Sequence, residues 1–394
     1  MSARPLLPGT RVDGQPATLG VMGGGQLGRM FVQAAQAMGY FTAVLDPDPD
    51  SPAGLISHHH IPTDYLDEQG LTRLAQAASA ITTEFENVPA PALATLGAQR
   101  PVAPAADAVA IAQDRAREKA HFQRCGVPVA PYAVIETPEQ LAAVDAALLP
   151  GILKTARLGY DGKGQIRVKT PAELAAAWDT LKQAPCVLEQ MLPLAAECSV
   201  IVARGWQGEM VNFPVQLNEH RDGILAVTQV FDGNVPAALA EQAVASARAI
   251  AEGLQYVGVL CVEFFVLADG RLIVNEMAPR PHNSGHYTQN GCDVSQFELQ
   301  VRTLAGLPLV TPRLHSPTFM LNLLGDLWFD AAGQPITPAW SAVLALPGTH
   351  LHLYGKLDAR RGRKMGHLNI TGSSVEAVRT TALRAAALLG IAPF

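Results

Sequence analysis

Residues 261–277 read CVEFFVLADGRLIVNEM, two apolar runs on either side of Asp269-Gly270. This pattern predicts a β-hairpin, because Asp-Gly is a preferred two-residue turn between strands. With that turn, Glu263 falls directly opposite Glu276. Two facing carboxylates destabilise an apolar ladder unless a proton, a water molecule or a cation neutralises them. Because carboxylate oxygens are ligands that Mg²⁺ prefers, the hairpin predicts a magnesium site.

Composition narrows the class of protein. The chain has 394 residues, 48% hydrophobic and 16% charged, with a net charge of −6. A chain of this size is expected to form two to three domains without needing a disulfide or metal to hold its core together. The acidic balance disfavours nucleic-acid and membrane partners, and no apolar run approaches the ~18 residues of a membrane span. Five scattered cysteines without a CxxC pair indicate a reducing cytoplasm, and argue against a disulfide framework and a zinc site.

The order of the expected elements indicates a mixed α/β and α+β class. Strands at 17–22 and 40–45 flank a helical pattern, which is a βαβ beginning. Residues 199–230 alternate like an antiparallel sheet, and residues 237–254 are typical of a long helix. Residues 1–16 lack an apolar signal core, and we expect a disordered extension there.

A first glycine-rich turn, GGGQLG at residues 23–28, fits the GxGxxG pattern between a strand and a helix. Asp46 follows about twenty residues later, as in a dinucleotide-binding site. The physics is more general, because the free amides of any helix N-terminus can bind a phosphate monoester. A tight turn with no ligand is the third interpretation.

A second glycine-rich loop, GYDGKGQ at residues 159–165, follows a strand that ends near Lys154. Its amides and lysine predict a flap over a polyphosphate, although an ordinary hairpin has the same pattern. Lys154 needs a partner, because a buried ammonium group is costly. Arg115 and Lys119 on the preceding helix are either further phosphate cations or part of a solvated helix face.

Two polar segments complete the pattern. Residues 275–286, NEMAPRPHNSGH, leave the predicted metal strand and can position an oxyanion, unless they form a polar surface loop. Residues 356–364 hold five cations and predict a pocket for a small phosphorylated substrate. The four features together imply two phosphorylated ligands, one of them a nucleoside triphosphate with a metal.

These motifs resemble, in order along the chain, those of the 5-(carboxyamino)imidazole ribonucleotide synthases. This family of ATP-grasp enzymes is also called the ATPase subunit of phosphoribosylaminoimidazole carboxylase. The resemblance rests on GGGQLGRM, EFENVP, QDRAREK, GYDGKGQ, VEFF, NEMAPRPHNSGH and LYGK with RRGRKMGH, and covers nearly the whole chain from about Thr18. It implies an ATP-grasp fold with an N-terminal Rossmann-like (pre-ATP-grasp) domain and a small β-rich C-terminal subdomain.

The resemblance also implies domain boundaries, which we expect as follows: the extension 1–16, the Rossmann-like domain 17–112, the small ATP-grasp lobe with the glycine flap 113–187, the large lobe with the magnesium site 188–313, and the C-terminal subdomain 314–394.

The implied reaction is the ATP-dependent carboxylation of 5-aminoimidazole ribonucleotide with bicarbonate, through carboxyphosphate, in de novo purine biosynthesis. The implied ligands are ATP, Mg²⁺, bicarbonate and the ribonucleotide, and the implied assembly is a homodimer in the cytoplasm. Three alternatives stay open: another ATP-grasp ligase, such as a formate-dependent ribonucleotide transformylase; an NAD-binding oxidoreductase; and a non-catalytic nucleotide sensor.

Residue roles follow from the resemblance by position. ATP is assigned to Arg115, Lys154, the loop Gly159, Tyr160, Asp161, Gly162, Lys163, Gly164 and Gln165, the hinge Glu189, Gln190, Met191 and Leu192, and Glu197, His220, Asn275 and Glu276. Bicarbonate and the substrate amine are assigned to Glu84, Tyr160, Lys163, His282, Asn283 and Lys356. The ribotide and its phosphate are assigned to Gly24, Gly25, Gln26, Leu27, Lys356, Arg363 and Lys364, and the metal to Glu263 and Glu276.

Overall fold

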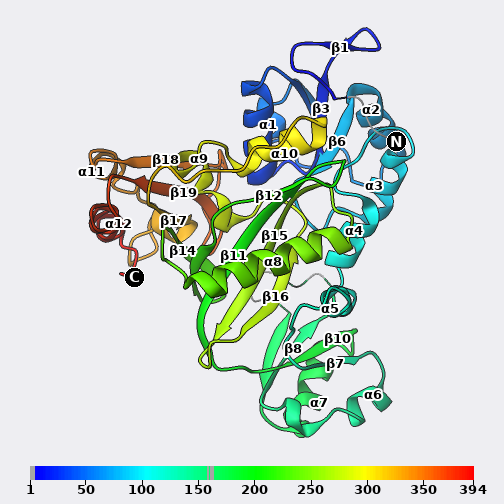
Figure 1. Cartoon of the computed structure of the whole chain (residues 1–394), viewed down its shortest axis with the longest axis vertical. Helices are drawn as coiled ribbons and strands as arrows, with labels where there is room; N and C mark the ends of the chain where they lie inside the picture. The colour runs from blue at the N-terminus through cyan, green and yellow to red at the C-terminus, as the bar shows by residue number, and fades with distance from the viewer. Residues whose placement is uncertain (1–4, 158, 160–163) are drawn as a thin grey trace.

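The structure is a computed structural model that describes residues 5–157, 159 and 164–394. Three larger β-sheets carry the architecture, in the mixed α/β and α+β class expected from the sequence. Figure 1 shows the N-terminal sheet and the smaller of the antiparallel sheets at opposite ends of the molecule, with the largest sheet between them. Among the described residues, no helix is long and apolar enough to cross a membrane.

The N-terminal sheet is entirely parallel and has the order β5-β4-β3-β6. Its strands are buried because helices pack on both faces, α1 and α10 on one and α2, α3 and α4 on the other. The expected βαβ beginning is confirmed. The elements are β3 (Thr18–Met22), α1 (Gln26–Ala37), β4 (Phe41–Leu45), η1 (Gly54–Ile56), β5 (His59–Ile61), α2 (Glu68–Ala77), β6 (Ala80–Thr83), α3 (Ala90–Gly97) and α4 (Ala106–Ala112).

The segment before this domain is ordered where the structure describes it. Two short strands, β1 (Arg11–Val12) and β2 (Gln15–Pro16), form a hairpin. The Leu6 amide donates to the Ala305 carbonyl oxygen at 2.8 Å. Its side chain packs on the apolar core between the parallel sheet and helices α1 and α10. The expectation of a disordered extension is therefore wrong for residues 5–16, since local composition does not reveal that Leu6 finds an apolar surface to cover.

The smaller antiparallel sheet follows α5 (Arg115–Arg124) and has the order β7-β10-β8-β9. Leu153 and Leu188 pack with α7 on one face. Because side chains alternate along a strand, Lys154 and Glu189 point to the opposite face. The elements are β7 (Tyr132–Ile135), α6 (Pro138–Ala142), η2 (Ala146–Leu148), β8 (Gly151–Thr155), β9 (Gln165–Val168), α7 (Pro171–Thr180) and β10 (Cys186–Gln190).

The largest sheet has nine antiparallel strands in the order β16-β15-β11-β13-β14-β17-β19-β18, with β12 paired to β11. The C-terminal strands continue this sheet through the pairing of β14 with β17, and α11 and α12 cover their outer face. The strands are β11 (Leu194–Arg204), β12 (Met210–Asn212), β13 (Gln216–Arg221), β14 (Ile224–Val230), β15 (Gly258–Leu267), β16 (Leu272–Ala278), β17 (Thr318–Leu324), β18 (Thr349–Leu353) and β19 (Lys364–Thr371).

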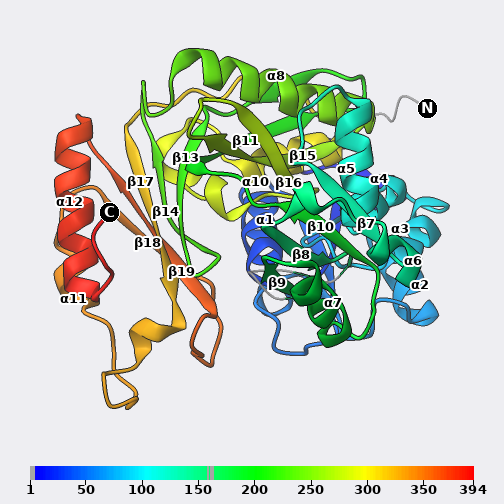
Figure 2. The same ribbon diagram turned by 90° about the horizontal axis from the view of Figure 1, so that it is seen from below.

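Helices lie on both faces of the first half of this sheet. Figure 2 shows α8 lying along one face, seen at the top of that view. The helical elements are α8 (Ala237–Gly253), η3 (Asn283–Gly285), α9 (Thr288–Gly291), α10 (Gln296–Ala305), η4 (Gly325–Trp328), α11 (Trp340–Leu344) and α12 (Val375–Leu389).

The alternation of β15 decides which side chains reach the functional face. Leu260, Val262 and Phe264 pack with α8. Val259 and Cys261 belong to the core on the opposite face, beside α10. Glu263 follows Cys261 by two residues and therefore shares its face. The apolar pattern of one strand thus directs a carboxylate away from the α8 core.

The β15–β16 hairpin confirms the predicted pairing of Glu263 with Glu276, but not the predicted turn. The Leu267 amide donates to the Arg271 carbonyl oxygen, so the connection has three residues instead of two. Gly270 closes it with a φ of +85°. A bulge between Glu263 and Phe264 then restores the register. The two-residue turn was wrong because side-chain pattern alone does not distinguish these loops, and the bulge compensates for the shift.

Leu260→Ala should strongly destabilise the unit that contains the largest sheet. Leu260 is completely buried between this sheet and α8. The variant loses apolar burial and leaves a cavity, which together should lower the free energy of unfolding by about 2–5 kcal/mol. Denaturant unfolding followed by circular dichroism measures the loss. The same substitution at Leu357, which is 80% exposed, is the control and should change stability by less than about 0.5 kcal/mol. Equal effects of the two variants would contradict the assigned core.

Candidate active site

One cavity of about 1070 Å³ lies where elements of all three sheets meet. It brings together most of the residues that the sequence singles out, although they are far apart along the chain. The described members that line it are Gln26, Leu27, Glu84, Arg115, Lys154, Gly159, Gly164, Gln165, Glu189, Gln190, Met191, Leu192, Glu197, His220, Glu263, Asn275, Glu276, His282, Asn283 and Lys364. Gly24, Gly25, Lys356 and Arg363 are not among the lining residues. Tyr160, Asp161, Gly162 and Lys163 lie outside the described residues.

Three buried charges form the wall made by the smaller antiparallel sheet. Glu189 accepts ion pairs from Lys154 at 3.0 Å and Lys119 at 3.2 Å through the same carboxylate oxygen. Burial alone would raise the pKa of Glu189, but the two ammonium groups lower it, so the carboxylate is charged. The expectation that Lys154 needs a partner is confirmed. The solvated-face interpretation is wrong for Lys119, whose side chain is 1% exposed.

In the hinge segment that follows Glu189, two backbone amides already donate hydrogen bonds within the protein. The Gln190 amide donates to the Pro131 carbonyl oxygen, and the Met191 amide donates to that of Pro150, both at 2.9 Å. Recognition of adenine by this segment would therefore fall to the Leu192 amide and to carbonyl oxygens.

Helix α5 connects Gly159 with strand β16. Arg115 pairs with Glu276 at 3.1 Å and reaches the Gly159 carbonyl oxygen at 3.5 Å. One helical turn on, Glu118 accepts the Met277 amide at 2.7 Å. Burial and the nearby Glu276 carboxylate raise the pKa of Glu118 to about 8. The solvated-face interpretation is wrong for Arg115 as well, because its guanidinium faces a carboxylate in the cavity.

The paired carboxylates on β15 and β16 form the floor of the cavity. Glu263 contacts His282 Nε2 at 3.2 Å through Oε1. Burial and the facing Glu276 raise the pKa of Glu263 to about 7. Asn275, at the bulge, has a buried Oδ1 atom without a hydrogen-bond partner among the described residues. The two facing carboxylates fit a divalent cation, and Asn275 Oδ1 is a further hard oxygen donor in the lining of the same cavity.

Glu197 and His220 stand beside this floor on neighbouring strands. Glu197 Oε2 contacts His220 Nδ1 at 2.8 Å. Burial opposes protonation of His220, but the hydrogen bond with Glu197 and the charge of Glu263 together raise its pKa. The facing carboxylates therefore favour protonation of the ring, and both residues line the cavity.

The glycine-rich turn before α1 is occupied by the protein's own carboxylates. Glu84 accepts the amides of Gly25 and Gly28, both at 2.7 Å. Asp46 accepts the Gly24 amide at 2.6 Å and the Tyr65 hydroxyl at 2.8 Å. A Cβ atom at Gly25 would lie 2.4 Å from Glu84 Oε1, which explains glycine at that position.

This arrangement bears on the dinucleotide alternative. Asp46 is tied to the turn instead of being free for a ribose, and the amides of Gly24 and Gly25 already bind carboxylates. Gln26 and Leu27, at the start of α1, are the members of the turn that face the cavity. The geometry therefore disfavours a pyrophosphate on the glycines and leaves room for one anion at the helix N-terminus.

The C-terminal cations are only partly gathered here. Lys364 lines the cavity. Lys356 donates to the Lys364 carbonyl oxygen at 2.7 Å, and burial, followed by the charge of Arg363, lowers its pKa to about 8. Arg363 donates to the Asp358 carbonyl oxygen at 2.7 Å. Of the predicted anion pocket, only Lys364 lines the cavity. Lys356 lies near enough to Glu84 for the charge of that carboxylate to raise its pKa in part.

Sequence reasoning missed several residues of the cavity. Arg280 forms a close ion pair with Glu86 and joins the largest sheet to the N-terminal domain. Gln113, Glu118 and His286 also line the cavity. The motifs EFENVP and NEMAPRPHNSGH contain Glu86 and Arg280, so a charge-complementarity search between motifs could have found this pair.

Comparison with known proteins agrees with this geometry. Three family models match the chain: a ribonucleotide synthetase pre-ATP-grasp domain over residues 16–113, an ATP-grasp domain over 120–297 and a phosphoribosylaminoimidazole carboxylase C-terminal domain over 318–381. The expected ATP-grasp fold with its pre-ATP-grasp and C-terminal domains is confirmed.

Relatives match over nearly their whole length. The N5-carboxyaminoimidazole ribonucleotide synthase of Brucella melitensis is 44% identical, with 89% of this chain and 95% of the relative covered. An ADP complex of an N5-carboxyaminoimidazole ribonucleotide synthetase is 39% identical, covers 97% of each chain and has a TM-score of 0.88. The Aspergillus clavatus enzyme with ADP and 5-aminoimidazole ribonucleotide is 30% identical, covers 95% of this chain and 99% of its own, and has a TM-score of 0.85. The chain therefore belongs to the N5-carboxyaminoimidazole ribonucleotide synthase family of ATP-grasp proteins.

Proposed function

We propose that this protein carboxylates 5-aminoimidazole ribonucleotide with bicarbonate at the expense of ATP. The observation that carries the proposal is one cavity with two differently equipped ends. One end has Lys154, Arg115 and the paired carboxylates, which suit a metal-bound polyphosphate. The other end has the N-terminus of α1 and Lys364, which suit a ribotide phosphate, and Glu84, which suits its amine. Relatives carrying this name, and a structure holding both ADP and the ribonucleotide, support the assignment.

For the metal, we propose that Glu263 and Glu276 bind Mg²⁺; the unsatisfied Asn275 Oδ1 lines the same cavity. When bound there, the metal would supply positive charge that offsets the negative charge developing during phosphoryl transfer. Arg115 now neutralises Glu276 and would turn toward a phosphate when the metal is present.

The chain's own groups do the positioning. Lys154 is ion-paired with Glu189 at 3.0 Å and would bind phosphate oxygens of ATP. Glu84, held by two backbone amides, faces the end assigned to the ribotide and would orient its amine. Asn283 has both polar side-chain atoms buried without a hydrogen-bond partner among the described residues, so it would pay a desolvation cost until bicarbonate or the carboxylated product arrives.

Phosphate release tests the reaction. We expect release from ATP and Mg²⁺ to rise at least tenfold only when bicarbonate and 5-aminoimidazole ribonucleotide are both present, since attack requires both bound partners. A coupled phosphate assay measures it, with each substrate omitted in turn. Release indifferent to the ribonucleotide would refute the substrate assignment, and full activity with formate in place of bicarbonate would select the transformylase alternative.

Glu263→Gln should stabilise the metal-free protein at alkaline pH. Burial and Glu276 raise the pKa of Glu263 from 4.5 to about 7. Between these pH values the folded protein holds a proton that the unfolded chain has lost, so this group makes the fold less stable as pH rises. We expect the variant to melt roughly 2–4 °C above the wild type at pH 8, and the difference to disappear toward pH 5.

Mg²⁺ with ATP should reverse this order, stabilising the wild type and not the Gln variant. Glu241→Gln, an exposed substitution on α8, is the matched control and should follow the wild type in both scans. A Glu263→Gln protein that still gains stability from Mg²⁺ would remove Glu263 from the metal site.

Lys356 should impose an alkaline limit on turnover. Burial and the charge of Arg363 lower its pKa to about 8, so its positive charge is lost as pH rises through that value. We expect kcat/KM for the ribonucleotide to fall above pH 8 in the wild type, and Lys356→Arg to move this fall beyond pH 9, because guanidinium stays charged. The exposed Lys169→Arg is the control. An unchanged profile in Lys356→Arg would exclude Lys356 as the titrating group.

The homodimer, the cytoplasmic location, the domain boundaries and the individual site roles remain predictions from the sequence and its resemblance. We propose that they hold for this protein as well, except for a disordered extension at residues 5–16 and for phosphate binding by the Gly24 and Gly25 amides, which already bind carboxylates. Size-exclusion chromatography with light scattering would test the dimer.

A further inference from the structure

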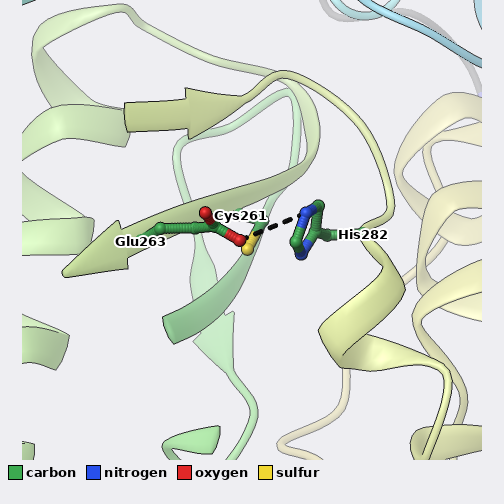
Figure 3. Close-up of side chains that lie close together, drawn as sticks. All are labelled: Cys261, Glu263 and His282. Carbon is green, nitrogen blue, oxygen red and sulfur yellow. Dashed lines mark ion pairs between the residues drawn. The ribbon is translucent and has the colours of Figure 1, made fainter. Parts of the chain in front are cut away.

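Cys261, Glu263 and His282 form a cluster of three different metal-ligating side chains (Figure 3). One ligand atom of each lies within 4.8 Å of the other two. This is the one such group of three or more found among the residues that the structure describes. The absence of a CxxC pair argued against a zinc site, but that argument counted only ligands close in sequence.

The fold explains why the three meet. Cys261 and Glu263 are two residues apart on β15 and share the face opposite α8. His282 follows β16 and returns over that face, so that its Nε2 atom lies 3.2 Å from Glu263 Oε1. Its Nδ1 atom lies 3.0 Å from Ser284 Oγ. Ser284 Oγ in turn accepts a hydrogen bond from the Ser199 hydroxyl at 2.8 Å, so the side that holds Nδ1 is anchored to the sheet.

We propose that these three side chains bind a borderline-soft divalent cation of the zinc class. Thiolate, imidazole and carboxylate are the donors that Zn²⁺ takes in proteins, and three protein ligands leave a fourth position open. The ion would replace the proton shared by His282 Nε2 and Glu263 Oε1. In the ligand-free structure Nδ1 accepts the Ser284 amide at 3.3 Å, so metal binding through Nε2 would shift the ring proton to Nδ1, where Ser284 Oγ, 3.0 Å away, would accept it. The Cys261 thiol would lose its proton to solvent on binding.

The position of the cluster provides an entry path. Glu263 and His282 line the cavity, with side chains 13% and 16% exposed, while Cys261 lies fully buried beneath them. The ion would therefore enter through the cavity, with its open position facing the nucleotide end. Mg²⁺ disfavours sulfur and imidazole ligands, so this site selects a different metal from the Glu263–Glu276 pair.

Glu263 belongs to both ligand sets, which makes the two metals exclusive. This consequence rests on the proposed function, whereas zinc binding itself does not. Zinc would hold one of the two carboxylates needed for Mg²⁺ and would inhibit turnover in competition with Mg²⁺.

Direct binding tests the site without turnover. The full-length, ligand-free protein is titrated with Zn²⁺ against a chromophoric chelator, and separately with Co²⁺ as a spectroscopic probe. We expect one Zn²⁺ per chain and a thiolate-to-cobalt charge-transfer band in the near ultraviolet. Cys261→Ser, which keeps the side-chain size, and Cys261→Ala should each weaken Zn²⁺ binding about tenfold or more and abolish the band. Circular dichroism confirms that each variant is folded.

Cys125→Ser is the matched control, since Cys125 is also a thiol beside an imidazole. Its Sγ atom lies 3.4 Å from His121 Nε2, but no third ligand joins them in the described part of the chain. This variant should bind Zn²⁺ like the wild type. Equal Zn²⁺ affinity in the wild type and both Cys261 variants, or a cobalt complex without the band, would overturn the proposal.

A second readout separates this proposal from the assigned reaction. In the phosphate-release assay, Zn²⁺ should inhibit the wild type, and a tenfold excess of Mg²⁺ should relieve the inhibition. Inhibition that Mg²⁺ does not relieve would contradict the shared Glu263. If the protein fails to carboxylate the ribonucleotide but still shows Cys261-dependent zinc binding, the proposed function fails and the zinc site stands.

Discussion

The opposition of two carboxylates, Glu263 and Glu276, is the constraint on which the rest of the site depends. Each sits on a strand whose neighbouring side chains are buried in apolar cores, so neither can move away without breaking the hairpin. The surrounding groups partly neutralise this negative charge. Arg115 pairs with Glu276, His282 contacts Glu263, and burial raises the pKa of Glu263 to about 7. These partial compensations allow two facing carboxylates to share one hairpin.

At the other end of the cavity, the protein's own carboxylates bind the backbone amides of the glycine turn. The glycine turn before α1 is partly filled by Glu84 and Asp46, which follow the two strands that flank β3. The parallel sheet places its carboxyl ends at one edge, so these side chains reach the same turn. Because the Gly24 and Gly25 amides already bind carboxylates, this geometry disfavours binding of a dinucleotide pyrophosphate at the turn.

Buried polar contacts hold the two ends in register. Arg280 pairs with Glu86 across the boundary between the N-terminal domain and the largest sheet. Beneath the floor, Ser199 contacts Gln216, Asn218 and Ser284, which steadies the segment carrying His282. Such networks are costly when half satisfied and rigid when complete, so they favour one arrangement of the cavity over others.

The sequence by itself determined the strands and helices, the facing of Glu263 and Glu276, and the motifs that assign the family, because alternation, capping and glycine turns are local properties of a chain. It did not determine the three-residue turn with its compensating bulge, the packing of residues 5–16, or the burial of Lys119. Only the tertiary structure decided that Arg280 meets Glu86, that Glu84 closes the glycine turn, and that Cys261 lies beside His282. The physical reason is that burial and charge pairing depend on which surfaces meet, and surfaces distant in sequence meet only when the cores have packed.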